Sequence, residues 1–128
     1  MNVLLDTCTF LWLALQPNRL SEAARAAIND TGNLLFLSHV SVWEVALKHS
    51  GGKLVLPATP RLWFPPRLSF FQVQLLAIEM EAFLLSVELP RVHADPFDRL
   101  LGAQAISRGF SIVTPDPLFS LLGAASIW

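Results

Sequence analysis

Four acidic residues occupy comparable places along this chain of 128 residues, each beside the end of a predicted strand or the start of a predicted helix. Asp6 closes the apolar run Val-Leu-Leu, and Asp116 follows the run Ser-Ile-Val-Thr. Glu44 lies early in the helix predicted after a second apolar run, and Asp98 lies in the first turn of a helix that starts near Pro96. In a doubly wound α/β sheet these positions meet at one edge, where such folds bind ligands. We therefore expect the four carboxylates to gather in one crevice.

Such a cluster of carboxylates predicts a bound cation. Carboxylates brought together repel one another, which raises their pKa values and destabilises the fold unless a cation lies between them. Oxygen ligands without a cysteine or histidine cluster favour Mg²⁺ or Mn²⁺ over zinc. Mg²⁺ keeps several waters and takes few protein carboxylates, which suits an open site that acts on phosphates. The acids thus indicate metal-assisted hydrolysis of a phosphodiester bond.

Helix capping is the structural alternative for three of these positions. Asp116-Pro117 and Asp95-Pro96 each have the form of an N-cap followed by proline at the first helical position. Ser41-x-x-Glu44 matches a capping box. Asp6 is harder to explain in this way, because an aspartate that closes an apolar central strand usually serves an ion or a reaction. Taken together, the four acids favour the metal site.

The elements that must position these acids follow from the alternation of apolar runs and helical segments. Strands are predicted at 3–5, 34–37, 71–76, 111–113 and 125–127, and helices at 7–15, 21–29, 38–49, 79–87, 96–108 and from Pro117. Ser21 is the expected cap of the second helix, and Gly109 ends the longest one. Short, wholly apolar strands are typical of a parallel sheet covered on both faces. The expected fold class is therefore α/β, a three-layer sandwich with a central, mainly parallel sheet of four to five strands.

Composition narrows the class of protein further. Apolar residues make up 53% of the chain and charged residues 15%, which excludes a disordered chain and fits a single domain over residues 1–128. The lone cysteine, Cys8, excludes an intrachain disulfide. No apolar run reaches 18 residues, and the run 3–15 lacks a basic leader, so we expect a cytoplasmic protein without a membrane segment.

The net charge of −1 at first argues against a polyanionic partner. If the four clustered acids hold a metal, however, the rest of the chain carries 9 basic residues against 10 − 4 = 6 acidic ones. The near-zero net charge then averages an acidic pocket with a mildly basic remainder. RNA is therefore not excluded as a substrate.

Four segments carry the acids: Val-Leu-Leu-Asp-Thr-Cys-Thr-Phe-Leu-Trp (3–12), Leu-Ser-His-Val-Ser-Val-Trp-Glu-Val-Ala-Leu-Lys (37–48), His-Ala-Asp-Pro-Phe-Asp-Arg-Leu-Leu-Gly-Ala-Gln-Ala (93–105) and Ile-Val-Thr-Pro-Asp (112–116). In type and order they resemble the motifs of PIN-domain proteins, and more closely those of VapC-type toxins of bacterial toxin–antitoxin pairs. The resemblance implies a PIN-like fold and a metal-dependent endoribonuclease that cleaves cellular RNA. It also implies Mg²⁺ or Mn²⁺ held by the four acids, a small cognate antitoxin and a homodimer.

Three hydroxyl residues take secondary roles by the same resemblance, and two basic residues are candidates from their charge alone. Thr7 and Thr114 match positions whose hydroxyls orient a carboxylate or a metal-bound water, and Ser41 is expected to act as support, cap or both. Lys48 and Arg99 are weaker candidates for phosphate contacts, and Arg99 is alternatively an ion-pair partner of the acid beside it.

A histidine beside the third motif and a proline-rich segment carry two further expectations. The histidines have no metal-ligand spacing. His93 directly precedes the third motif, where it could approach a substrate, but a hydrogen bond at the surface is the favoured expectation. The segment 57–71 departs from the family pattern, because a continuous helix is not expected to pass Pro65-Pro66, and a truncated helix is predicted there.

Two other function classes share features with this sequence. Phosphatases of the haloacid dehalogenase class also begin with an apolar strand that ends in aspartate, but they need a second acid two residues later, where this chain has Cys8. That class is excluded. A catalytically silent PIN-like binding module stays open, because retained acids do not prove turnover.

Overall fold

The central element is one sheet of five short strands, seen in a computed structural model that describes residues 1–128. The strands are β1 (Asn2–Leu5), β2 (Leu34–Ser38), β3 (Val73–Leu76), β4 (Ser111–Val113) and β5 (Ser126–Ile127). Their order is β3-β2-β1-β4-β5, and every neighbouring pair is parallel. The predicted parallel sheet is confirmed, with β1 at its centre.

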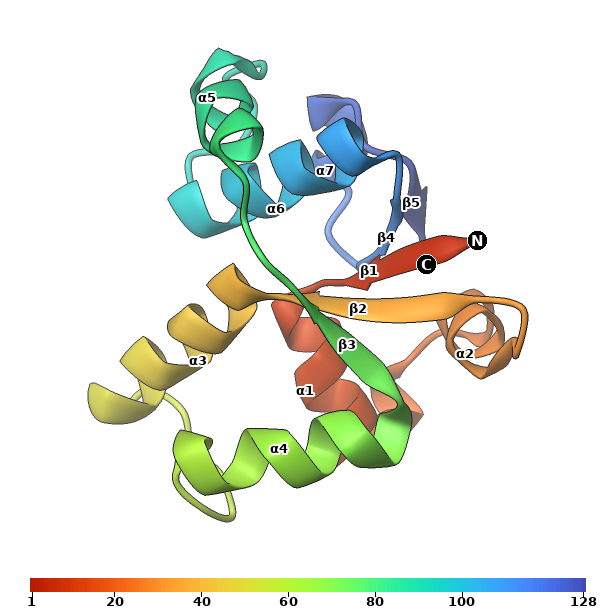
Figure 1. Ribbon diagram of the computed structural model, residues 1–128, viewed down its shortest axis with the longest axis vertical. Coiled ribbons are helices and arrows are strands. Elements are labelled where there is room, and N and C mark those ends of the chain that lie inside the picture. Colours follow the sequence, from red (N-terminus) through yellow and green to blue (C-terminus); the bar gives the residue numbers. More distant parts are fainter.

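Helices cover both faces of the sheet. They are α1 (Thr7–Leu15), α2 (Glu22–Asn29), α3 (His39–Ser50), α4 (Pro60–Phe71), α5 (Met80–Glu88), α6 (Pro96–Arg108) and α7 (Leu118–Leu122), with a single 3₁₀ turn at Pro17–Arg19. Figure 1 shows α5, α6 and α7 on one side of the sheet and α1, α2 and α4 on the other, which confirms the three-layer α/β sandwich. None of these helices has the length and apolar character needed to cross a membrane.

Two apolar cores hold the layers together, one on each face of the sheet. Successive side chains of a strand point to opposite faces. Val3 and Leu5 of β1 therefore pack into the core under α1 and α4, whereas Leu4 between them packs into the core under α5, α6 and α7. All three side chains are fully buried, so β1 is fixed from both sides. This fixes the position of the residue that follows it, Asp6.

Helix α4 differs from the prediction, because it runs without a break from Pro60 to Phe71 with Pro65 and Pro66 inside it. Two prolines remove two helical hydrogen bonds, those to the carbonyls of Arg61 and Leu62. All four of these residues are exposed, so water can bond to the two carbonyls.

Burial of the opposite face offsets this loss. Trp63 and Phe64 of α4 are buried, and their rings lie 5.8 and 6.2 Å from that of Phe10. The truncation was therefore a wrong prediction, because tertiary packing outweighs the local cost of the prolines. The longer helix also moves the start of β3 to Val73, after Gln72 ends α4 in the left-handed conformation with φ 54°.

The helix starts agree with the predicted caps at Ser21 and Asp95 and differ at Ser41. At the fourth, Asp116, the Oδ1 atom accepts the N–H of Leu118 at 2.9 Å, although α7 begins at Leu118, one residue later than predicted. Ser21 caps α2 and Asp95 caps α6, each through a side-chain oxygen that accepts a backbone N–H. Helix α3 instead begins at His39, and its cap is Ser38, whose hydroxyl accepts the N–H of Val40. The predicted capping box that begins at Ser41 is therefore wrong. This residue lies inside the helix, and its hydroxyl is used elsewhere.

The prolines of α4 provide a test of this account. Replacing Pro65→Ala restores a helical N–H at an exposed position, so we expect the free energy of unfolding to rise by about 1–2 kcal/mol. The gain should stay below the full helix-propensity difference, because proline also restricts the unfolded chain. Pro60→Ala is the matched control at the first helical position, where proline costs nothing, and should not stabilise the protein. Urea unfolding of both variants measures the difference. A loss of stability in Pro65→Ala would contradict the account.

Candidate metal centre

The carboxyl ends of the central strands meet where the sheet order reverses. The chain goes from β1 to β2 and β3 on one side, and β4 and β5 lie on the other side of β1. Doubly wound folds bind ligands in the crevice at such a point. Asp6 directly follows β1 at this edge, and its N–H donates to the carbonyl of Val113 at the end of β4 (3.1 Å). The topology thus places the first predicted acid at the centre of the edge.

Three donors hold the Asp6 carboxylate in place. Its Oδ1 accepts the backbone N–H of Thr7 at 2.7 Å, and its Oδ2 accepts the hydroxyl of Thr114 at 2.7 Å. The thiol of Cys8 approaches the same Oδ2 at 3.5 Å. Asp6 is only 5% exposed, so its orientation is set by the protein and not by solvent.

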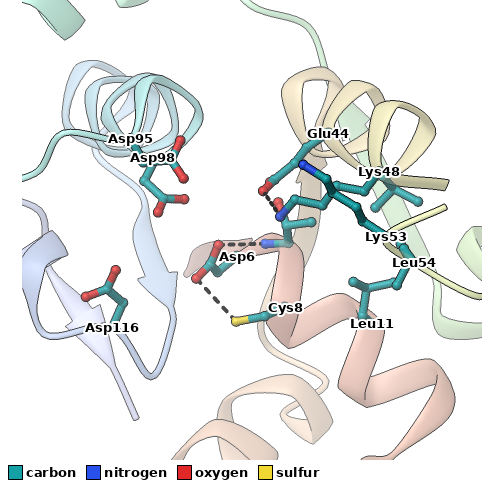
Figure 2. A pocket seen from close by; sticks show the side chains of 12 residues that line it. Asp6, Cys8, Leu11, Glu44, Lys48, Lys53, Leu54, Asp95, Asp98 and Asp116 are labelled. Carbon is teal, nitrogen blue, oxygen red and sulfur yellow. Dashed lines mark hydrogen bonds and ion pairs between the residues drawn. The ribbon is translucent and has the colours of Figure 1, made fainter. Parts of the chain in front are cut away.

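All four predicted acids line one cavity of about 390 Å³. Figure 2 shows Asp6 in the middle, with Glu44 on one side and Asp98 and Asp116 on the other. Asp95, the cap of α6, lies at the same wall and adds a fifth acid. The acids come from the end of β1, from α3, from the start of α6 and from the loop after β4, which lie far apart in the sequence. The predicted gathering of carboxylates is present.

Glu44 contributes a buried oxygen without a partner. Its side chain is 7% exposed, and its Oε2 accepts from the ammonium group of Lys48 at 2.7 Å on the next turn of α3. Its Oε1 is buried and has no hydrogen-bond partner. An unpaired buried carboxylate oxygen is costly, so this atom is fitted to a partner that the protein does not itself supply.

Asp98 and Asp116 meet at a histidine that was expected at the surface. The Nε2 atom of His93 lies 3.0 Å from Oδ2 of Asp98 and 3.0 Å from Oδ2 of Asp116, and the His93 side chain is only 10% exposed. His93, Asp98 and Asp116 could together hold an ion, since their ligand atoms lie within 4.8 Å of one another. The surface role of His93 was therefore a wrong prediction. The only signal in the sequence is its place in the loop before α6, five residues from Asp98.

The electrostatics of the pocket show what the crowding of carboxylates costs. Burial, then the charge of Asp6, raise the pKa of Asp98 from 3.8 to about 7. Burial also raises the pKa of Asp6, and the charge of Glu44 adds to that effect. The Cys8 thiol likewise has a raised pKa, because it is buried beside Asp6, and it stays protonated. A cation among these groups would remove the repulsion.

Three hydroxyls surround the acids, with different roles. Thr114 donates to Asp6 as described, and its oxygen also accepts the N–H of Asp116 at 3.1 Å, so one side chain links two acids. The hydroxyl of Thr7 donates to that of Ser41 at 2.8 Å and ties α1 to α3. Thr7 contacts Asp6 through its backbone and not through its hydroxyl. Ser41 is thus a support between two helices.

The two basic candidates lie in unlike surroundings. Lys48 pairs with Glu44 on the wall of the pocket, and half of its side chain is exposed. The guanidinium of Arg99 instead donates to four backbone carbonyls, those of Ser86, Leu89, Pro90 and His93, at 2.8–3.1 Å. The structure therefore gives Arg99 neither the expected phosphate contact nor the alternative ion pair with Asp98, because its donors are already engaged.

These donors fit a divalent cation. They are mainly carboxylate oxygens, which hard cations such as Mg²⁺ and Mn²⁺ prefer. The unpaired Oε1 of Glu44 and the raised pKa values of Asp6 and Asp98 are features expected of residues that hold a cation.

The raised pKa of Asp98 predicts how the metal-free protein responds to pH. Between 3.8 and about 7 the folded state binds the Asp98 proton and the unfolded state does not. This contribution to stability is therefore complete below the unfolded pKa and is lost as the pH rises through about 7. At about pH 8, Asp98→Asn should stabilise the metal-free protein by about 1–2 kcal/mol.

Urea unfolding in the presence of EDTA measures the effect of Asp98→Asn. The stabilisation should shrink as the pH falls from about 7 towards 4, because below the unfolded pKa of 3.8 Asp98 is protonated in both the folded and the unfolded wild-type chain. Asp30→Asn, the same change at an exposed aspartate, is the matched control and should have little effect at either pH. Equal effects of Asp98→Asn at both pH values would contradict the electrostatic account.

Comparisons with known proteins agree with this architecture. The family model of the PIN domain matches residues 3–124. The chain is 34% identical over 115 residues to Ribonuclease VapC22 of Mycobacterium tuberculosis (strain ATCC 25618 / H37Rv), covering 89% of this chain and 86% of that protein.

Two solved structures share the fold. One is VapBC2 from Rickettsia felis bound to a DNA fragment from their promoter, with a TM-score of 0.68 at 16% identity, covering 98% of this chain and 97% of that chain. The other is DNA-bound VapBC from Salmonella typhimurium, with a TM-score of 0.69 at 20% identity, covering 98% and 96%. The family model, together with the relative of 34% identity, shows that this chain belongs to the PIN-domain family and, within it, to the VapC ribonucleases.

Proposed function

We propose that this chain is a metal-dependent endoribonuclease, one PIN domain that acts in the cytoplasm as the toxin of a toxin–antitoxin pair. The observation that carries the proposal is the convergence of Asp6, Glu44, Asp98 and Asp116 on one pocket in which a buried Glu44 oxygen has no partner. The relative named as a VapC ribonuclease supports the reaction, and the VapBC structures support the toxin role.

We propose that the four acids hold Mg²⁺ or Mn²⁺. When bound, such an ion polarises the phosphodiester and lowers the pKa of the attacking water. The chain supplies the rigid side of the site. Asp6 is fixed by Thr114 and by the Thr7 amide, so it would not need to reorganise when an ion binds. Preorganised groups of this kind lower the cost of reaching the transition state.

The basic side chains of the pocket wall would serve the RNA backbone. Lys48 and Lys53 both line the pocket. Lys48 already offsets the charge of Glu44, and half of its side chain faces solvent, so it can move towards a phosphate. We propose Lys48 as a phosphate contact and exclude Arg99, whose donors bond to backbone carbonyls.

Cleavage of RNA by the purified chain tests the proposal. We expect Mg²⁺- or Mn²⁺-dependent cleavage that EDTA abolishes and that added Mn²⁺ restores. Asp6→Asn should reduce the rate by at least about a hundredfold, because it removes a buried negative charge from the proposed metal site. Asp30→Asn, at an exposed aspartate outside the pocket, should leave the rate unchanged. Growth arrest on expression should follow the same pattern.

A wild-type chain that is folded but inactive would refute the proposed enzymatic activity. The catalytically silent binding module would then be the better explanation of the fold. If the wild-type protein cleaves none of a panel of cellular RNAs, its binding to RNA or to a partner protein should be measured instead. Equal cleavage by wild type and Asp6→Asn would point to a contaminating nuclease and also count against the proposal.

We propose in addition that the chain forms a homodimer and binds a small antitoxin through its exposed apolar side chains. Helix α5 presents four of them at positions i, i+3, i+4 and i+7, which share one face of a helix. They are Met80, Phe83, Leu84 and Val87, exposed by 49–75%. A second apolar group lies on α3, where Trp43 and Leu47 are exposed by 58% and 47%. Apolar surface of this kind marks protein interfaces.

Light scattering after gel filtration measures the association. We expect the mass of two chains for the wild type and the mass of one chain for Val87→Glu, because a charge on the α5 face cannot be buried without a partner. Val55→Glu, at a valine in a loop that is also largely exposed, is the matched control and should remain dimeric. A wild type that elutes as one chain at all concentrations would contradict the dimer.

A further inference from the structure

The loop between α5 and α6 is held by a single guanidinium group. Helix α5 ends at Glu88, and the last carbonyls of a helix lack intrahelical donors. Arg99 supplies donors from α6 to two of them, those of Ser86 (3.0 Å) and of Leu89 (2.8 Å). Its Nη1 atom donates to two carbonyls of the following loop, those of Pro90 (2.8 Å) and His93 (3.1 Å). Arg99 thereby fixes the backbone of the loop at the residue whose side chain reaches the acids.

The His93 ring is fixed as firmly as its backbone. The imidazole packs against Phe119, a fully buried residue, and the two rings make a T-shaped contact with their centroids 6.0 Å apart. Nε2 is directed at the carboxylates of Asp116 and Asp98, 3.0 Å away from each. Nδ1 lies on the opposite side, where the backbone N–H of Asp95 donates to it at 3.3 Å.

This last contact decides where the imidazole carries its hydrogen. A backbone N–H can only donate, so Nδ1 must present its lone pair and carry no hydrogen. In the neutral ring the hydrogen is then on Nε2, which donates to Oδ2 of Asp116 and lies against Oδ2 of Asp98. Binding a metal through Nε2 would require the opposite tautomer, and the hydrogen on Nδ1 would then face the amide hydrogen of Asp95.

We infer that His93 is a positioning residue of the metal site, which holds the Asp98 and Asp116 carboxylates together through its Nε2–H and does not itself ligate the ion. The inference rests on the proposed metal-binding function and assigns the histidine a role within it. It explains why one imidazole contacts two acids through their Oδ2 atoms. Oδ1 of Asp98 is left for the pocket, whereas Oδ1 of Asp116 accepts the backbone N–H of Leu118 at 2.9 Å. Partners of this kind orient metal ligands and typically change metal affinity by about ten- to a hundredfold when removed.

The tautomer is measured directly by ¹⁵N NMR of the full-length chain labelled on its histidine ring nitrogens, at about pH 8, where an unperturbed imidazole is neutral. In the metal-free protein we expect His93 to carry its hydrogen on Nε2 and none on Nδ1. Saturation with Mg²⁺ should leave this pattern unchanged. The signals are assigned with His93→Gln, and His39 and His49, which do not line the pocket, serve as internal references.

A hydrogen on Nδ1, a doubly protonated ring, or loss of the Nε2 hydrogen on saturation with Mg²⁺ would each overturn the inference. Calorimetry with Mg²⁺ separates this failure from failure of the proposed function. Binding of Mg²⁺ with loss of the Nε2 hydrogen would make His93 a ligand and leave the metal site intact. Absence of Mg²⁺ binding would refute the metal site, and the tautomer would still be decided by the metal-free spectrum.

Two substitutions test the positioning role by Mg²⁺ affinity. His93→Leu removes the donor and should weaken binding by about ten- to a hundredfold. His93→Gln places an amide N–H near the position of Nε2–H and should recover most of the affinity, although glutamine lacks the ring that packs on Phe119. His39→Leu, at an exposed histidine, is the matched control. Wild-type affinity in His93→Leu, or equal losses in the leucine and glutamine variants, would overturn the role.

Discussion

The hydrogen bond from the Thr114 hydroxyl to the buried Asp6 carboxylate joins the two strands on which the rest of the site depends. It connects the end of β1 to the end of β4 across the point where the sheet order reverses. Because β1 is packed from both faces, Asp6 cannot move away from the crevice. The other acids arrive from helices and loops that start at the same edge, so the topology of the sheet determines their meeting.

Crowding of negative charge is the cost of this arrangement, and the protein compensates each acid from its outer side. Asp6 receives a hydroxyl and an amide, Glu44 receives the ammonium group of Lys48, and Asp98 and Asp116 share the imidazole of His93. The inner side of the cluster stays uncompensated, as the raised pKa of Asp98 and the unpaired Glu44 oxygen indicate. Donors thus surround the cluster, and Glu44 and Asp98 each keep one oxygen without a hydrogen-bond partner, an arrangement suited to a cation among them.

The loop before α6 shows how a structural residue decides the form of a functional site. Helix α5 ends with carbonyls that need donors, and Arg99 supplies them from the neighbouring helix. The same guanidinium fixes the backbone at His93. Asp95 caps α6 through its side chain, and its backbone N–H determines which nitrogen of the imidazole carries the hydrogen. The helix end, the helix start and the acid cluster are thus parts of one hydrogen-bonded unit.

The sequence by itself determined the parallel sheet, the places of the acids and the caps of α2 and α6, because these depend on local patterns of apolar and polar residues. It predicted the convergence on one pocket, since parallel strands share an edge. Only the tertiary structure decided that α4 passes Pro65-Pro66 and that Ser41 bonds to Thr7. It also decided that His93 contacts Asp98 and Asp116 and that Arg99 holds the loop before α6. The bonds of Arg99 go to backbone carbonyls, which carry no residue identity, and the prolines are tolerated because of aromatic packing from a distant helix. Contacts of this kind leave no spacing in the sequence from which they could be read.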